Sequence, residues 1–137
     1  MLEVPGQSDC ETITLLFNDP FYVVAASRDG AVRILDTSSG ACRHTMSGHT
    51  GRISGLASNG NTLASGGGSD QTIRLWDIAT GDCLKVFQMH GEGTPTRLAF
   101  DPTGHYLAAS IFGGERIADI WDITQGSVRM RVAQHRC

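Results

Sequence analysis

Three side chains in the middle of the chain are of the types that form a hydrolytic triad, namely His49, Ser65 and Asp70. A serine becomes a nucleophile when a histidine accepts its proton and a carboxylate orients that histidine. The histidine, however, recurs as His90 and His135, at intervals of 41 and 45 residues. Recurrence at a fixed period is typical of a structural position in a repeat, so we predict that the chain is not an enzyme.

Two other groups of residues could do chemistry, and neither has the required pattern. The run Gly66-Gly67-Gly68 lacks the Gly-Lys-Ser/Thr ending of a phosphate-binding loop, and we expect it only to lengthen a turn. The four cysteines are far apart in the sequence and form neither a Cys-x-x-Cys pair nor a zinc-like cluster with histidine. We therefore predict no metal site and no cofactor.

The composition favours a folded domain with a protein partner. Of the 137 residues, 40% are hydrophobic and 18% are charged, and the net charge is −3. This charge offers no electrostatic attraction to nucleic acid. The longest apolar run, Phe21 to Ala26, is far shorter than the roughly 20 residues of a membrane-spanning helix. Because the opening residues also lack the pattern of a secretory signal, we expect the chain in the cytoplasm or nucleus.

An internal repeat organises the chain. Besides the histidines, an aspartate and a glycine recur with the same intervals of 41 and 45 residues. These markers are Asp36, Asp77 and Asp122, followed by Gly40, Gly81 and Gly126. Three markers that keep one register indicate three copies of one structural unit.

Each unit has the pattern of β-strands. The segment Thr72-Ile73-Arg74-Leu75-Trp76 alternates polar and apolar residues, which is the period of a strand with two unlike faces. Glycine-containing turn sequences separate such segments, and no stretch keeps the spacing of an amphipathic helix. We predict four strands per unit, which in the second unit lie near residues 53–57, 62–65, 73–77 and 83–87.

A Gly-His pair followed by a closing Trp-Asp, here Gly48-His49 and Trp76-Asp77, resembles the signature of the WD-repeat β-propellers. The resemblance implies an all-β fold, a partial β-propeller in which three four-stranded antiparallel blades form an open arc. The expected blades cover about residues 12–47, 48–89 and 90–135 of a WD-repeat region at 12–137, after an N-terminal tail at 1–11.

The resemblance also implies a role for the residues of the apparent triad. In a WD blade, an aspartate, a histidine, a serine or threonine and the tryptophan form a structural hydrogen-bonded tetrad. These positions correspond here to Asp70, His49, Ser65 and Trp76. Buried polar groups of this kind are costly unless they are all paired, so such a tetrad specifies one blade geometry.

The first and third units depart from this pattern. The first has Leu35 where the tryptophan is expected, and the third has Glu115 at the position of the turn aspartate. The third unit also places Ala118 and Asp119 where the second has an isoleucine and an arginine. We predict incomplete hydrogen-bond networks in both units.

For function, the resemblance implies a non-catalytic scaffold or adaptor for protein–protein interaction. The alternative is a substrate-receptor or assembly subunit of a larger complex, such as a ubiquitin ligase, a coat or a chromatin adaptor. Partners in the family commonly dock on the face that carries the loops before the first strand and the turns before the aspartate. The matching candidates are Arg28, Arg52, Ser54, Ser69, Thr94 and Thr96. Arg28 and Arg52 are favoured because arginine is enriched at the centres of interfaces.

Three blades are fewer than the 4–8 with which propellers typically close. We therefore expect the sequence to be a fragment or short form of a longer propeller protein. The alternative is self-association of two arcs that completes the propeller, because an open arc leaves apolar blade faces exposed.

Overall fold

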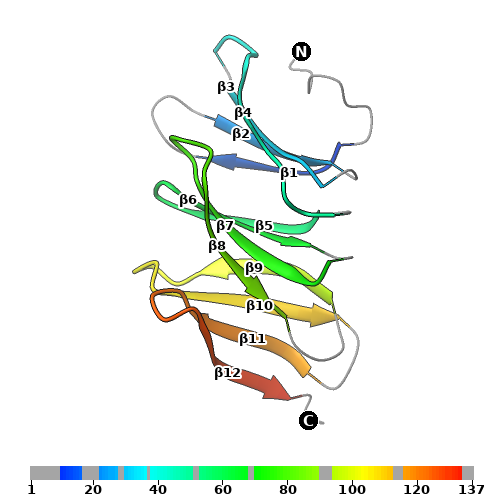
Figure 1. Cartoon of the computed structure of the whole chain (residues 1–137), viewed down its shortest axis with the longest axis vertical. Coiled ribbons are helices and arrows are strands. Elements are labelled where there is room, and N and C mark those ends of the chain that lie inside the picture. The colour runs from blue at the N-terminus through cyan, green and yellow to red at the C-terminus, as the bar shows by residue number, and fades with distance from the viewer. Residues whose placement is uncertain are drawn as a thin grey trace.

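The three predicted units are three four-stranded antiparallel sheets, which confirms the all-β fold (Figure 1). The computed structural model describes residues 10–16, 22–27, 30–36, 38–50, 53–67, 70–89, 94–112 and 116–133. Several positions of interest in the sequence lie outside the described residues: Arg28, Arg52, Ser69, His90, Glu115 and His135.

Consecutive strands pair within each sheet. The first sheet consists of β1 (Cys10–Leu16), β2 (Tyr22–Ser27), β3 (Val32–Asp36) and β4 (Cys42–Met46). The second consists of β5 (Ile53–Asn59), β6 (Thr62–Gly67), β7 (Thr72–Asp77) and β8 (Cys83–Gln88). The third consists of β9 (Thr94–Phe100), β10 (Tyr106–Phe112), β11 (Arg116–Asp122) and β12 (Ser127–Ala133).

The predicted strands of the second unit agree with the observed ones to within two residues at either end. The main difference lies at the start of the chain, where β1 begins at Cys10, inside the segment predicted as a tail. Cys10 pairs with Ser27 across a bulge, so the ladder between β1 and β2 extends further than the apolar pattern of β1 indicates.

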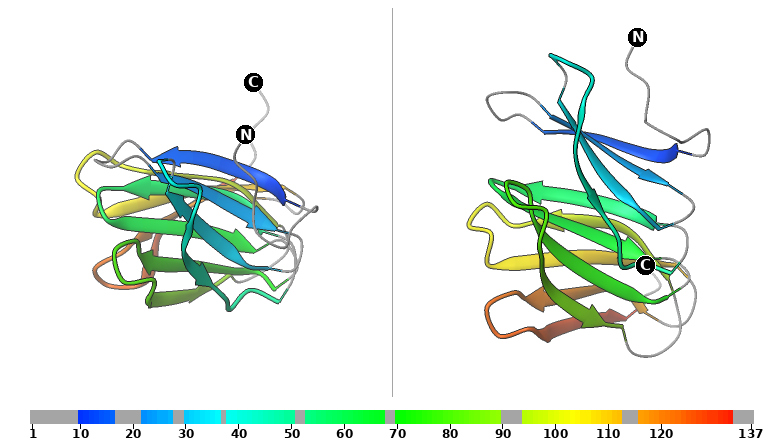
Figure 2. Two further views of the ribbon diagram at one scale, coloured as in Figure 1. Left: turned by 90° about the horizontal axis from the view of Figure 1, so that it is seen from above. Right: turned by 45° about the horizontal axis from the view of Figure 1, so that its top comes forward.

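The sheets are arranged side by side like blades, and the views of Figures 1 and 2 show them succeeding one another along the molecule. The first strands of neighbouring sheets lie next to each other, β1 beside β5 and β5 beside β9. The fourth strands β4, β8 and β12 form the opposite edge of each sheet.

Two apolar layers hold the sheets together. Between the first and second sheets, Val24, Ile34 and Met46 pack on Leu63 and Trp76. The layer between the second and third sheets contains a ring stack in which Phe87 and Trp121 lie 5.1 Å apart between centroids, with an interplanar angle of 10°. Each repeat thus buries its apolar face only against the neighbouring repeat, as expected for a repeat architecture.

The repeated aspartates and glycines form one turn that recurs between the third and fourth strands. In each turn the glycine N–H donates to the backbone carbonyl of the aspartate, over 2.8, 2.7 and 2.8 Å in chain order. The three glycines have φ of 74°, 79° and 70°, a left-handed conformation that residues with a Cβ rarely adopt. The recurrence of this turn explains why the markers keep their register.

Candidate functional site

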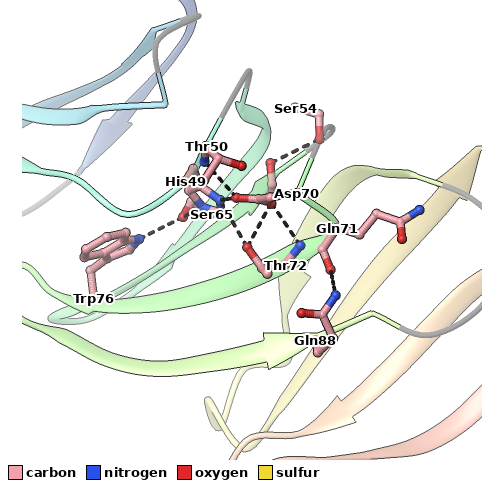
Figure 3. Close-up of polar contacts among 10 residues, drawn as sticks. His49, Thr50, Ser54, Ser65, Asp70, Gln71, Thr72, Trp76 and Gln88 are labelled. Atoms are coloured by element: carbon pink, nitrogen blue, oxygen red, sulfur yellow. Dashed lines mark hydrogen bonds and ion pairs between the residues drawn. The ribbon is translucent and has the colours of Figure 1, made fainter.

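The four residues of the predicted tetrad are connected by hydrogen bonds within the second sheet, as Figure 3 shows. The indole N–H of Trp76 donates to Ser65 Oγ over 2.8 Å. Ser65 Oγ lies 2.6 Å from His49 Nε2, and His49 Nδ1 lies 3.0 Å from Asp70 Oδ2. The chain of contacts runs from β7 through β6 to the segment before β5 and ends in the turn between β6 and β7.

The donors and acceptors of this chain assign the protonation of the histidine. The indole nitrogen can only donate, so Ser65 Oγ accepts from Trp76 and gives its own proton to His49 Nε2. His49 then carries its proton on Nδ1 and donates it to the carboxylate of Asp70. With a neutral imidazole, each of these four side chains has a hydrogen-bond partner within the network.

Asp70 also organises the turn in which it lies. It accepts hydrogen bonds from the backbone N–H of Thr50 over 3.1 Å and from the backbone N–H of Thr72 over 3.0 Å. The hydroxyl of Thr72 donates to Asp70 Oδ1 over 2.9 Å. Thr72 is a fifth member of the network that sequence analysis missed, although its place two residues after an aspartate is a known signal of an Asx-type turn.

The glycine run of the second unit supports the network instead of lengthening a turn. Gly66 and Gly67 belong to strand β6, contrary to the prediction. A Cβ atom at Gly67 would lie 2.6 Å from His49 Nδ1 and still closer to Asp70 Oδ1. The histidine and the aspartate therefore meet directly over a position where only glycine leaves room.

The environment of the network changes the acidity of both titratable members. Burial lowers the pKa of His49 below its ordinary value of 6.5 and outweighs the hydrogen bond and charge of Asp70, which raise it. Burial by itself raises the pKa of Asp70, but hydrogen bonds from Thr50, His49 and Thr72 together lower it below its ordinary value. The neutral histidine and the ionised aspartate are thus the stable forms at neutral pH.

Three of these residues, His49, Ser65 and Asp70, have the connectivity of a hydrolytic triad but not its accessibility. Ser65 has an exposed fraction of 0% and His49 one of 5%. The hydroxyl of Ser65 also accepts the indole N–H, so both its donor and an acceptor lone pair are occupied. A nucleophile must reach its substrate, and this hydroxyl is sealed inside the sheet.

Comparison with known families accounts for this architecture. The family model described as "WD domain, G-beta repeat" matches residues 40–77 and 81–122, which together make up more than half of the chain. The chain belongs to the WD-repeat family. Members of this family are generally non-catalytic scaffolds, and the predicted resemblance is confirmed.

Several WD-repeat proteins are similar in sequence. The beta subunit of a guanine nucleotide-binding protein from Arabidopsis thaliana is 32% identical over 127 residues, which are 88% of this chain and 33% of that protein. The small ribosomal subunit protein RACK1z of Arabidopsis thaliana is 33% identical over 87 residues, 63% of this chain and 25% of that protein. A BOP1 homolog for ribosome biogenesis from Caenorhabditis elegans is 43% identical over 77 residues, 53% of this chain and 11% of that protein. The chain spans a third or less of the length of these relatives.

The WD repeat of the third sheet has an incomplete network. The indole nitrogen of Trp121 is buried and has no hydrogen-bond partner among the described residues. By strand register, Ala109 stands where the second sheet has Ser65, because the pairs Leu107↔Trp121 and Ala109↔Asp119 match Leu63↔Trp76 and Ser65↔Arg74. The missing acceptor is therefore the hydroxyl that an alanine cannot supply.

Of the six candidate partner-binding residues, the structure describes the side chains of two. Ser54 in β5 is half-buried, and its hydroxyl points to the carbonyl of Gly66, 3.1 Å away, and to that of Pro95 in the next sheet. Thr96 in β9 is exposed and lies 2.9 Å from Ser110 Oγ through its own Oγ1. Thr94 begins β9 and pairs with Phe112. Ser54 thus links two WD repeats, whereas the side chain of Thr96 is exposed.

Two further features concern only the residues that the structure describes. Among those residues no helix is long and apolar enough to cross a membrane. The same residues hold no group of three or more histidine, cysteine, aspartate or glutamate side chains that could bind a metal ion.

Proposed function

We propose that this chain is a non-catalytic protein–protein interaction module of the WD-repeat type. The observation that carries this proposal is the use of Ser65, His49 and Asp70 as a sealed internal network. Because their hydrogen bonds stabilise a rigid sheet, we expect recognition to take place at the loops that connect the strands. Membership of the WD-repeat family supports the same conclusion.

The proposed docking face is the end of the molecule that carries the loops before the first strands. Its candidate residues are Arg28, Arg52, Ser69, Thr94 and Thr96, and Ser54 supports the face by its contact with Pro95 of the neighbouring sheet. The exposure of Thr96 supports this choice. Arginine on such a face forms two parallel hydrogen bonds with a carboxylate or phosphate, so acidic or phosphorylated peptides are the expected ligands.

Proximity labelling with quantitative mass spectrometry tests this proposal. The wild-type chain is compared with the double variant Arg28→Glu/Arg52→Glu and with the control Arg43→Glu, a charge reversal at an exposed position of β4. We expect a set of proteins that the double variant loses at least tenfold and the control retains. If the double variant and the wild type label the same proteins equally, the docking face is wrong.

The second candidate function is that of an assembly subunit. The printed names of two relatives describe them as a subunit of a guanine nucleotide-binding protein and as a protein of the small ribosomal subunit. The part of each relative that the chain covers supports the proposal that it belongs to a longer propeller protein or is a short form of one. Size-exclusion chromatography of the tagged chain from cell extract distinguishes an assembly subunit, which elutes with a large complex, from an adaptor in transient contacts.

A further inference from the structure

The outer edge of the second sheet carries two exposed aliphatic side chains. Strand β8 forms this edge, and its residues Leu84 and Val86 have exposed fractions of 52% and 49%. Apolar layers shared with the first and the third sheets cover the two faces of the second sheet. The two side chains therefore lie on the outer rim of a sheet that has a neighbour on each side (Figure 1).

The corresponding edges of the other two sheets are polar. At the register shift of each fourth strand, the unpaired residue is Arg43 in β4, Leu84 in β8 and Arg129 in β12. Two positions later, the equivalent exposed residues are Thr45, Val86 and Arg131. Polar and charged side chains on an edge strand hinder its pairing with another chain. Strand β8 lacks this protection at both positions.

The backbone of β8 is also available on its outer side. The N–H of Met89 donates to the carbonyl of Gln71 over 2.9 Å, which sets the alternation of the ladder between β7 and β8. In an antiparallel ladder, alternate residues of a strand direct their N–H and C=O groups to the same neighbour. The backbone groups of Val86 and Gln88 therefore point away from β7, to the position of a further strand.

A cation lies beside Val86 on the face toward the first sheet. Arg74 of β7 is paired with Val86. A Cβ atom at Gly48 would lie 2.7 Å from Arg74 Nη1, so the guanidinium lies against the backbone of this glycine. The Nε atom of Arg74 is buried and has no hydrogen-bond partner among the described residues. Asp82 directly precedes β8 and is thus nearer to Leu84, so an incoming acidic side chain is favoured beside Val86.

The charged side chain of β8 itself is directed to the other side. Lys85 Nζ donates to the carbonyl of Ile123 over 2.6 Å and to that of Thr124 over 3.4 Å, both in the third sheet or its turn. Lys85 is paired with Leu75, which belongs to the apolar layer shared with the third sheet. Arg74 is therefore the cation that shares a face with Val86.

We propose that β8 is a docking edge for an extended, acidic segment of a protein partner, which adds to the second sheet as a further strand. The segment forms main-chain hydrogen bonds with Val86 and Gln88. Its aliphatic side chains pack on Leu84 and Val86, and a carboxylate pairs with Arg74. Strand addition takes its affinity from the main chain and its specificity from alternate side chains.

A second copy of the chain fits this edge less well than an acidic partner. Two β8 strands paired with each other would place the same segment, Cys83–Gln88, on both sides of the contact. This segment contains a lysine and no acidic residue, so it offers no carboxylate to Arg74. The pairing would instead bring two lysines close together, and like charges across a strand pair are destabilising.

Selection of binders from a phage-displayed library of random peptides tests this edge. The edge variant Leu84→Arg/Val86→Thr gives β8 the residues that β4 has at the corresponding positions. The control Thr45→Arg adds the same charge to the edge of β4, at a position where β12 has an arginine. We expect peptides with alternating aliphatic residues and an acidic residue, which bind the edge variant at least tenfold more weakly than the wild type or the control. If no selected peptide distinguishes the wild type from the edge variant, the proposal is overturned.

Two measurements on a selected peptide test the geometry. On binding, hydrogen exchange should slow at the amides of Val86 and Gln88, and methylation of alternate peptide nitrogens should weaken binding at least tenfold. Replacement of the acidic residue by its amide should weaken binding to the wild type at least tenfold and have no effect on Arg74→Gln. Slower exchange only outside β8, or equal effects of the amide on both proteins, overturns the assignment. A wild-type dimer in sedimentation that the edge variant loses assigns the edge to a second copy and likewise overturns it.

This inference rests on the proposed scaffold function but not on the proposed docking face, so the two can fail separately. The variant Arg28→Glu/Arg52→Glu should bind the selected peptides as the wild type does. The edge variant should keep the labelled proteins that depend on Arg28 and Arg52. Loss of peptide binding in both variants would contradict a separate edge site and would leave the docking face in place.

Discussion

Replacement of Ser65 by alanine tests the structural role of the tetrad most directly, because Ser65 is the central member of the chain. The substitution removes the hydroxyl that accepts from Trp76 over 2.8 Å and contacts His49 over 2.6 Å. One buried donor and one buried acceptor are then left without partners. An unsatisfied buried polar group costs about 1–3 kcal/mol. The two together predict a loss of about 2–6 kcal/mol in the free energy of unfolding.

This loss is large compared with the total stability of a domain of this size, which is about 5–15 kcal/mol. Urea unfolding followed by tryptophan fluorescence measures it, since Trp76 and Trp121 lie in the second and third sheets. In thermal unfolding, the same loss corresponds to a fall in Tm of roughly 10 °C.

The control is Ser58→Ala, which removes an exposed hydroxyl from the neighbouring strand β5. We expect this variant to remain within about 0.5 kcal/mol of the wild type, as is usual for surface substitutions. If Ser65→Ala is as stable as Ser58→Ala, the network does not stabilise the sheet, and the structural explanation of these residues is refuted.

Three further predictions follow from the same network. Ala109→Ser supplies the acceptor that Trp121 lacks and is expected to raise the free energy of unfolding by about 1 kcal/mol in the same urea assay; a decrease would show that the site has no room for a hydroxyl. Gly67→Ala forces a Cβ atom between His49 and Asp70 and is expected to destabilise at least as much as Ser65→Ala, with fluorescence of Trp76 as readout. Because folding lowers the pKa of His49, the unfolded chain binds more protons than the folded chain below pH 6.5. The urea midpoint should therefore decrease as the pH is lowered from 7.5 to 5, and it should decrease less in His49→Gln. The lowered pKa of Asp70 adds a second loss as the pH falls through and below 3.8, and an unchanged midpoint from pH 7.5 to 5 would contradict the histidine part.

The parts of the fold that the sequence predicts are those encoded within one turn or one strand. The recurring aspartate and glycine predict the turn between the third and fourth strands, because a hydrogen bond and a positive φ at glycine depend only on neighbours in the chain. The alternation in residues 72–76 predicts β7 for the same reason. Local chemistry sufficed there.

The parts that the sequence does not predict depend on strand register or on the approach of two sheets. That Ala109 deprives Trp121 of an acceptor follows only from the pairing of β10 with β11. The contact of the Ser54 hydroxyl with the Pro95 carbonyl depends on the close approach of β5 and β9. No residue pattern within either strand predicts this approach. Gly67 is required because two side chains from other segments meet above it.

The three repeats therefore share one backbone but differ in the polar interactions that fix it. The second sheet has a complete network and is packed on both faces by its neighbours. The third lacks the hydroxyl acceptor, so its opening costs less than that of the second sheet. Hydrogen exchange should accordingly protect the amides of β6 and β7 more than those of β10 and β11.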